Sequence, residues 1–381
     1  MVAITEALVL IFSLGILGMA GLCSSNARVP PVSDVDRMWS RIAIQPDDHG
    51  PRTPRPSNQF ASVTFLDDQR LAVAEEDRTG QLSDRRTLSG SSAFVLKMQV
   101  FNASTGDSAS SLSWPTRALE SSVQAVSGGL VVRTGPILRF YTSELRQISE
   151  IPLEHESAGE WAVSISNSRQ TVLLNHYDSR HSHFELLNGG TGKVNRTWES
   201  PSPLRPPYSI SDEAIVKSDL RQQQQVLFSR FGGQQWMVIP VPFKIGCATS
   251  PVWLTANLLV NADCREVSII SFTGDVLMRV ATSAGGSFES KVALSQDGRY
   301  VAAQRDEGKG GGFLDRDVRR TATQLVIYDV SLKKPIVTVN VSPLPIRNYD
   351  FALSPDGSKL AVLSDNTISV YRVKCSSKVC S

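Results

Sequence analysis

The sequence has little net charge, with 39 basic side chains against 37 acidic ones among its 381 residues, and it contains no run of five or more like charges. A near-neutral protein has no broad field to attract a polyanion, which argues against general nucleic-acid binding. Sustained helical periodicity is also missing beyond the N-terminus, while Gly, Pro, Ser and Thr interrupt the chain often. This composition is typical of short strands and turns and favours an all-β fold.

Catalytic motifs are missing as well. There is no Gly-x-Ser-x-Gly elbow of a hydrolase. The glycines at 310–312 do not form a phosphate loop, because no Lys-Ser or Lys-Thr follows them and no helix begins there. The six tryptophans are scattered, which favours packing between sheets over a sugar-binding platform. No residue can be assigned a catalytic role from the sequence, and whether the protein is an enzyme stays open.

An almost wholly apolar stretch spans residues 7–22, and the first basic residue, Arg28, follows it. This length is short for a transmembrane helix but suits the core of a signal peptide, and residues 25–27 offer the small side chains that a signal peptidase requires. No basic residue precedes the stretch, so an uncleaved membrane anchor and lipidation at Cys23 are alternatives. We expect a secreted, periplasmic or envelope-associated protein, with residues 1–27 as signal peptide or tether.

Four further cysteines fit export. Cys247 and Cys264 flank two predicted strands joined by a turn, and in the register that centres this turn they face each other. Directly opposed residues of a hairpin lie close enough for a disulfide. Cys375 and Cys380 could close a small ring near the C-terminus. The alternative is four inert thiols.

One strand–turn–strand pattern recurs along the chain. Residues 291–303 and 350–362 both place Leu-Ser-x-Asp-Gly between apolar strands, and residues 62–73 are a looser copy. Asp-Gly suits a tight turn because Gly tolerates positive φ and Asp bonds its own backbone. A second hairpin, ending in a polar turn, follows several of these segments. Each unit therefore has four strands.

The spacing of the units predicts the architecture. Units start near Phe60, Ser121, Glu160, Pro207, Cys247, Ser290 and Tyr349. This is the period of propeller blades, roughly 40 to 60 residues. A single four-stranded unit leaves both faces uncovered, and stacking such units around an axis buries them. We therefore predict a seven-bladed β-propeller of four-stranded antiparallel blades over residues 59–374.

The last unit has only three strands, which would leave an edge exposed. Residues 37–44 are strand-like and otherwise have no partner, so we predict that this N-terminal strand closes the last blade. Residues 28–58 then hold the closing strand and a Pro- and Arg-rich connector, and residues 375–381 form a tail.

The segments Leu353–Val362 and Leu294–Ala302 resemble the repeats of bacterial propellers related to TolB and to the WD-repeat superfamily. The turn at residues 105–107 is similar to the strand-ending turn of those repeats and of lactonase-like propellers. The Trp-Asp ending of true WD repeats is missing, and we expect neither the N-terminal α/β domain of TolB nor a following hydrolase domain. The resemblance implies the fold but little about activity, since such propellers serve as scaffolds, binding modules and enzymes.

Two long polar loops are the candidate ligand-binding segments. They join the second and third strands of units one and six, and they flank unit seven at one end of the predicted ring. Long loops in a domain of tight turns are functional or disordered, and the alternative is two solvated loops of mixed charge. The candidate ligand-binding residues are Glu75, Asp77, Arg85, Arg86, Arg305, Asp306, Asp315 and Arg319.

Three of the five histidines lie in unit three. If residues 177–180 form the turn, His176 faces His181 across the hairpin, and His183 points to the same side. Together with Asp178 these imidazoles could hold a divalent metal, and no other cofactor is indicated. The alternatives are exposed polar side chains and a pH-sensitive patch.

We expect a non-enzymatic binding or scaffold propeller whose partner is a protein or an envelope component. The alternative from a different class is a small-molecule hydrolase of lactonase-like type, with a metal in the central channel held by acidic or Asn side chains from several blades. A degenerate propeller with a purely structural task is the third possibility.

Overall fold

The computed structural model describes the parts of the chain that build the ring. These are residues 40–43, 61–78, 94–116, 121–153, 159–218, 225–233, 235–241, 251–282, 286–309, 319–341, 349–364 and 367–373. They form strands and turns, and no helix among them is long and apolar enough to cross a membrane. The predicted signal peptide or anchor at 1–27 and the predicted tail at 375–381 lie outside the described residues, as does most of the predicted connector.

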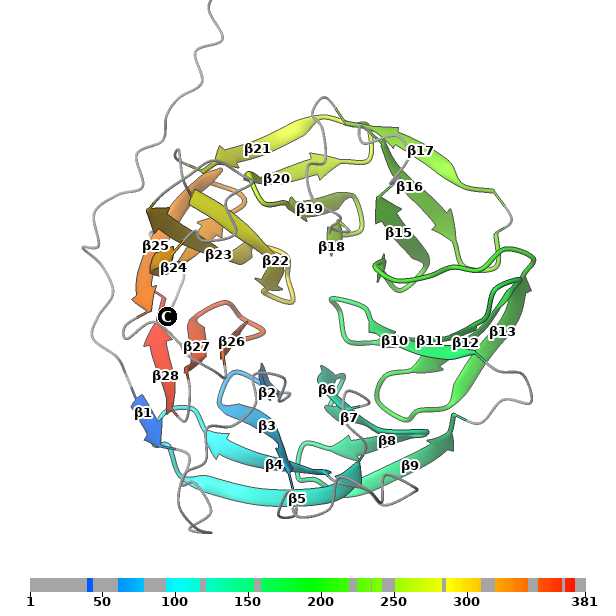
Figure 1. The fold of residues 1–381 in the computed structure, drawn as a ribbon, viewed down its shortest axis with the longest axis horizontal. Helices are drawn as coiled ribbons and strands as arrows, with labels where there is room; N and C mark the ends of the chain where they lie inside the picture. The colour runs from blue at the N-terminus through cyan, green and yellow to red at the C-terminus, as the bar shows by residue number, and fades with distance from the viewer. Residues whose placement is uncertain are drawn as a thin grey trace, which may run out of the picture.

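Seven four-stranded antiparallel sheets surround one axis, as predicted (Figure 1). Blade 1 consists of β2 (Ala61–Phe65), β3 (Arg70–Arg78), β4 (Phe94–Asn102) and β5 (Ser108–Thr116). Blade 2 consists of β6 (Ser121–Val126), β7 (Gly129–Thr134), β8 (Ile137–Thr142) and β9 (Gln147–Pro152). Blade 3 consists of β10 (Glu160–Ile165), β11 (Thr171–Tyr177), β12 (Ser182–Asn188) and β13 (Val194–Ser200). Blade 4 consists of β14 (Ser209–Ile210), β15 (Ala214–Ser218), β16 (Gln225–Arg230) and β17 (Met237–Pro240). Blade 5 consists of β18 (Val252–Thr255), β19 (Leu258–Ala262), β20 (Glu266–Ser271) and β21 (Val276–Ala281). Blade 6 consists of β22 (Gly286–Leu294), β23 (Tyr300–Lys309), β24 (Arg319–Asp329) and β25 (Lys334–Val341).

Blade 7 is built from both ends of the chain. Its strands are β26 (Tyr349–Leu353), β27 (Lys359–Ser364), β28 (Thr367–Arg372) and β1 (Ser40–Ala43). In the antiparallel pairing of β1 with β28, Ser40 lies opposite Val370 and Ala43 lies opposite Thr367. Figure 1 shows β1 on the outer side of β28. The predicted closing strand is confirmed, and it covers an edge that would otherwise present unpaired backbone groups.

The hydrophobic core is divided among the contacts between neighbouring blades. Each of seven buried clusters combines side chains of two adjacent blades. One of them joins Phe65 and Leu71 of blade 1 to Leu363 and Ile368 of blade 7, and all four side chains are completely buried. Alternation along each strand supplies both faces of the blade with apolar side chains, so each blade is covered only by its two neighbours.

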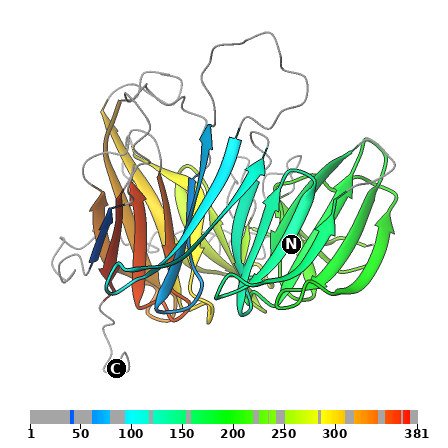
Figure 2. The same cartoon turned by 90° about the horizontal axis from the view of Figure 1, so that it is seen from below.

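The strands run between the two ends of the ring (Figure 2), and these ends carry different connections. We call one the turn end, because it carries the turns between the first and second and between the third and fourth strands of each blade. At this end Gly298 has φ +70°, and a Cβ there would meet the Leu254 carbonyl oxygen at 2.6 Å, which explains the Asp-Gly pattern of blade 6. The opposite loop end carries the connections between the second and third strands and between blades.

Removing residues 40–43 tests the closure of the ring. We expect the free energy of unfolding to fall by about 2–4 kcal/mol, because β28 loses a row of backbone hydrogen bonds worth about 1 kcal/mol each. Hydrogen exchange followed by mass spectrometry should show faster exchange in β28, with β17 of blade 4 unchanged as the internal control. Unchanged exchange in β28 would mean that β1 does not hold the ring closed.

Candidate functional site

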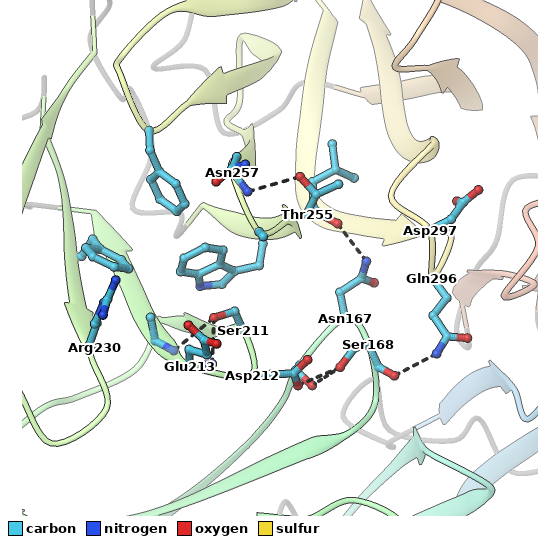
Figure 3. A pocket seen from close by; sticks show the side chains of 17 residues that line it. Asn167, Ser168, Ser211, Asp212, Glu213, Arg230, Thr255, Asn257, Gln296 and Asp297 are labelled. Atoms are coloured by element: carbon cyan, nitrogen blue, oxygen red, sulfur yellow. Dashed lines mark hydrogen bonds between the residues drawn. The ribbon is translucent and has the colours of Figure 1, made fainter.

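A cavity of about 540 Å³ opens at the turn end among blades 3, 4, 5 and 6 (Figure 3). Its walls are the turns that follow the innermost strands of these four blades, together with side chains from β16 and from the end of β20. The volume falls in the range of small-ligand and side-chain pockets, about 300–1,000 Å³. Of the residues singled out for ligand or metal binding in the sequence, those that the structure describes do not line it.

The turn of blade 3 is tied across to two other blades and forms one wall of the cavity. The side-chain amide of Asn167 donates to the carbonyl oxygens of Leu254 in blade 5 and Ser295 in blade 6, both at 3.2 Å. Gln296 of blade 6 donates in return to the Ser168 carbonyl oxygen at 2.8 Å. Figure 3 shows Gln296 directed toward Ser168, while the Asn167 amide is directed toward the blade 5 turn near Thr255. Three side chain-to-backbone bonds therefore fix the spacing of this wall.

The same turn also reaches blades 1 and 2. Arg169 has φ +64°, an uncommon conformation for a residue with a side chain, and the surrounding contacts hold it there. Its guanidinium donates to the Leu66 carbonyl oxygen at 3.1 Å, and its own carbonyl oxygen accepts from the Ser127 amide at 2.8 Å. Burial lowers the pKa of Arg169, against the opposing effect of the Asp68 and Asp67 carboxylates. The blade 3 turn is therefore hydrogen-bonded to blades 1, 2, 5 and 6 at the turn end.

The cavity has an aromatic floor. The ring of Trp253 lies 4.9 Å from that of Phe272 and 5.9 Å from that of Phe228, in edge-to-face arrangements, and the two phenylalanine rings are 5.3 Å apart. Trp253 is 4% exposed, yet its Nε1 has no hydrogen-bond partner within the described ranges of the chain. Buried indole N–H groups normally find an acceptor. The floor therefore contains one buried donor for which the described residues supply no acceptor.

The rim carries mostly negative charge. Asp212, Glu213 and Asp297 are exposed at the mouth, and among the described residues of the lining Arg230 is the one basic side chain. Asp212 accepts a hydrogen bond of 2.7 Å from the Ser168 hydroxyl, which links the turns of blades 3 and 4. Three carboxylates against one guanidinium leave an excess of negative charge.

The structure describes part of the predicted loop-end patch. Asp306 is buried in blade 6, where its Oδ1 accepts from Gln304 Nε2 at 3.0 Å and from the Thr323 hydroxyl at 2.8 Å. Arg305 lies 3.5 Å from the Glu307 carboxylate, and Glu75 pairs with Ala61 on the adjacent strand. The backbones of Asp77 and Arg319 lie in β3 and β24, and Arg85, Arg86 and Asp315 lie outside the described residues. The ligand role of this patch stays a prediction.

One loop-end residue that the sequence analysis did not single out is Glu76. It lies between Glu75 and Asp77 in β3 and is 2% exposed, and neither of its carboxylate oxygens has a hydrogen-bond partner among the residues that the structure describes. A buried carboxylate without a partner is unfavourable. Glu76 therefore marks the loop end of blade 1 as a second place where a polar ligand group could bind.

The predicted register of the histidine hairpin is wrong. His176 lies opposite His183, not His181. The reason is the turn, in which Asp178 Oδ1 accepts from the amides of Arg180 at 2.6 Å and His181 at 2.9 Å. This Asp-centred turn spans residues 178–181 and shifts the strands relative to the turn predicted at 177–180.

The three imidazoles have separate environments. His176 is buried, with its ring 5.0 Å from that of Trp161, while His181 Nδ1 lies 3.1 Å from Asp178 Oδ2. His183 lies within 3.6 Å of Glu185 and 3.7 Å of Glu199. Across the described ranges, no group of three or more His, Cys, Asp or Glu side chains is arranged to hold a metal ion. Neither the proposed histidine metal site nor a lactonase-like centre gains support from this part of the chain.

Among the cysteines, Cys264 lies at the bend between β19 and β20 and is disulfide-bonded. Its predicted partner Cys247, and the second pair, Cys375 and Cys380, lie outside the described residues, so both pairings stay predictions.

Asn167→Ala should lower the free energy of unfolding by about 1–3 kcal/mol, because two inter-blade hydrogen bonds are lost. It should also shift the indole Nε1–H resonance of Trp253, whose neighbour Leu254 accepts one of these bonds. The matched control is Asn102→Ala, which removes an asparagine that bonds only within its own turn. If both variants leave the Trp253 resonance unchanged, Asn167 does not define the cavity wall.

A pair of carboxylates at the turn end predicts a pH effect. Burial raises the pKa of Asp68 above 3.8, and the Asp356 carboxylate adds to this rise, although Asp68 Oδ1 also accepts a hydrogen bond of 2.9 Å from the Asp356 amide. Asp68 thus binds its proton more tightly in the folded state, so its ionisation is destabilising above the raised pKa.

Asp68→Asn removes the charge and keeps an acceptor for the Asp356 amide. We expect the variant to be more stable than the wild type at pH 7, with the difference shrinking as the pH falls through the raised pKa toward 3.8. Urea denaturation between pH 7 and pH 4 measures this. A variant less stable than the wild type at pH 7 would show that the attraction of the Asp68 carboxylate to nearby cations outweighs the cost of its burial and its repulsion by Asp356.

Comparison with known proteins defines the fold alone. No family model matches the chain, and no curated protein sequence does. Among solved structures, the C-terminal WD40 domain of Sif2 matches with a TM-score of 0.52 and 12% identity, covering 90% of this chain and 99% of that domain. Raptor from Chaetomium thermophilum matches with a TM-score of 0.56 and 11% identity over 90% of this chain, which spans only 30% of the Raptor chain. The chain therefore has a WD40-like β-propeller fold, while its predicted relation to TolB-like propellers stays a prediction.

Proposed function

We propose that this protein is a non-enzymatic binding propeller and that the turn-end cavity receives its ligand. The observation that carries the proposal is the cavity itself, which combines an aromatic floor of Trp253, Phe228 and Phe272 with exposed carboxylates at its rim. A concave site with an apolar floor and a few polar groups around it is the usual form of a ligand pocket.

The walls of the cavity suit a binding role because they are held in place before a ligand arrives. Asn167 and Gln296 connect the turns of blades 3, 5 and 6, and Ser168 connects that of blade 3 to blade 4 through Asp212. A site whose geometry is already fixed loses little conformational entropy on binding.

We further propose that the protein acts outside the cytoplasm, in the cell envelope or beyond it. The apolar stretch at residues 7–22 supports this, as does the disulfide-bonded state of Cys264, since structural disulfides persist in oxidising compartments. The partner we propose is a protein or an envelope component.

Ala256→Trp tests whether the cavity is the binding site. Ala256 is an exposed residue of the β18–β19 turn that lines the cavity, so an indole there should block the mouth without entering the core. Phage-displayed random dodecapeptides would be selected on the wild-type protein, and the enriched peptides titrated against both forms. We expect at least a tenfold loss of affinity in the variant.

Gln69→Trp is the matched control, because Gln69 is exposed in the equivalent turn of blade 1 and does not line the cavity. It should bind the peptides as the wild type does. If Ala256→Trp retains full affinity, the cavity is not the site. A loss of affinity on Glu76→Gln instead would place the site at the loop end.

A further inference from the structure

We propose that the two turns that meet where the ring closes form a proton-sensitive contact, in which Asp68 and Asp356 share one proton. The turns are the β2–β3 turn of blade 1, residues 66–69, and the β26–β27 turn of blade 7, residues 354–358, and we call them the closing turns. Acidification from neutral pH strengthens their contact. This inference does not involve the cavity, so its failure would leave the proposed function untouched.

The main chain holds the two carboxylates together. The Asp356 amide donates to Asp68 Oδ1 at 2.9 Å, and Lys359 Nζ donates to the Asp68 carbonyl oxygen. The adjoining strands β2 and β26 lie side by side (Figure 1), and there Asp350 Oδ2 accepts from the Val63 amide at 2.9 Å. The closing turns therefore cannot separate to relieve the repulsion of their carboxylates without breaking these bonds.

Each carboxylate keeps one oxygen for a shared proton. Asp356 Oδ1 accepts from the Ser354 hydroxyl at 2.6 Å, the Ser358 amide at 2.9 Å and the Ser358 hydroxyl at 2.8 Å. In the described part of the chain no residue donates to Oδ2 of either aspartate, and the two side chains lie within hydrogen-bonding reach of each other. One proton between them replaces the repulsion of two charges with a hydrogen bond to a carboxylate.

The surroundings place this proton on Asp68. Burial and the Asp356 carboxylate raise the pKa of Asp68 above 3.8, against the hydrogen bond from the Asp356 amide and the charge of Lys359. Burial acts in the same direction on Asp356, but hydrogen bonds from the two serines and from Asp68 outweigh it and lower the pKa of Asp356 below 3.8. Two groups that interact in this way titrate as a pair.

The other titratable groups around the pair come from blades 1, 3, 6 and 7. They are Asp67, Arg70, Arg169, Asp297, Arg299, Tyr300, Asp329 and Lys359. Asp67 and Arg70 form an ion pair of 2.7 Å, and Arg299 and Asp329 form one of 3.2 Å. The two remaining cations oppose protonation, yet the pKa of Asp68 is raised in their presence. The response to acid therefore comes from the pair itself.

The sign of the pH effect follows from these directions. As the pH falls through the raised pKa of Asp68 toward 3.8, the folded protein binds a proton that the unfolded chain does not yet hold, so the contact gains stability. As the pH falls below 3.8 through the lowered pKa of Asp356, the stabilisation from the ionised Asp356 is lost. The contact is therefore most stable between the two pKa values, with one proton shared.

The first test titrates the wild-type protein with ¹³C-labelled aspartate carboxyl groups, and NMR follows both resonances from pH 7 to pH 3. Asp68→Asn and Asp356→Asn assign the resonances. We expect Asp68 to titrate above 3.8 and Asp356 to titrate below it, each with a second, smaller step at the pKa of the other. Two independent single steps near 3.8 would overturn the proposal, and this result does not depend on the folding of a variant.

Amide hydrogen exchange then measures the contact itself. After correction for the intrinsic pH dependence of exchange, the protection factor of the Asp356 amide should rise by about threefold or more between pH 7 and pH 4, as for one hydrogen bond gained. In Asp68→Asn the side-chain amide donates to Asp356 at either pH, so the rise should disappear.

Asp297→Asn is the matched control, because Asp297 lies at the equivalent position of the blade 6 turn, where its Oδ1 accepts from Ser295 and from the Arg299 amide. It should leave the rise at Asp356 intact. A rise that persists in Asp68→Asn, or one that Asp297→Asn abolishes, would mean that the responsible proton binds elsewhere, and the inference would be wrong.

Discussion

Each blade has two apolar faces that it cannot cover by itself, and the whole molecule depends on covering them. Seven clusters of buried side chains join the seven neighbouring pairs of blades, so every blade is stabilised from both sides. The contact between blades 7 and 1 closes the ring and has a polar reinforcement. Asp350 Oδ2 accepts from the Val63 amide at 2.9 Å, and Asp350 Oδ1 pairs with Lys291 of blade 6. This carboxylate connects three consecutive innermost strands where the two ends of the chain meet.

Closure of the ring brings the turns of all the blades together at one end, and the cavity lies among these turns. The turns after the innermost strands must converge near the axis, where each carries backbone groups that need partners. The blade 3 turn meets this need for several blades at once, since Asn167 bonds to blades 5 and 6 and Arg169 to blade 1. The same turn forms one wall of the cavity, whose other walls come from blades 4, 5 and 6.

The fold could be predicted from the sequence because its signals are local. The Asp-Gly turns before Gly298 and Gly357 mark hairpins, and the apolar alternation beside them marks faces that need covering. The closing strand could also be predicted, since a blade of three strands and an unpaired strand-like segment have one simple solution. The histidine register could not, because it depends on which residue starts the turn, and the bonds of Asp178 decide this.

The cavity lay beyond sequence reasoning for a different reason. Its walls are short turns that are more than forty residues apart, such as those of Asn167 and Asp212, and no local pattern indicates that they meet. Trp253 was expected to pack between blades, and it does so in the cluster shared by blades 4 and 5. The sequence could not show that this packing gives the indole ring its apolar contacts but gives its N–H no acceptor among the described residues. The indole has an apolar body that the core covers and a polar N–H for which the described residues supply no acceptor, so one residue both packs between two blades and forms part of the cavity floor.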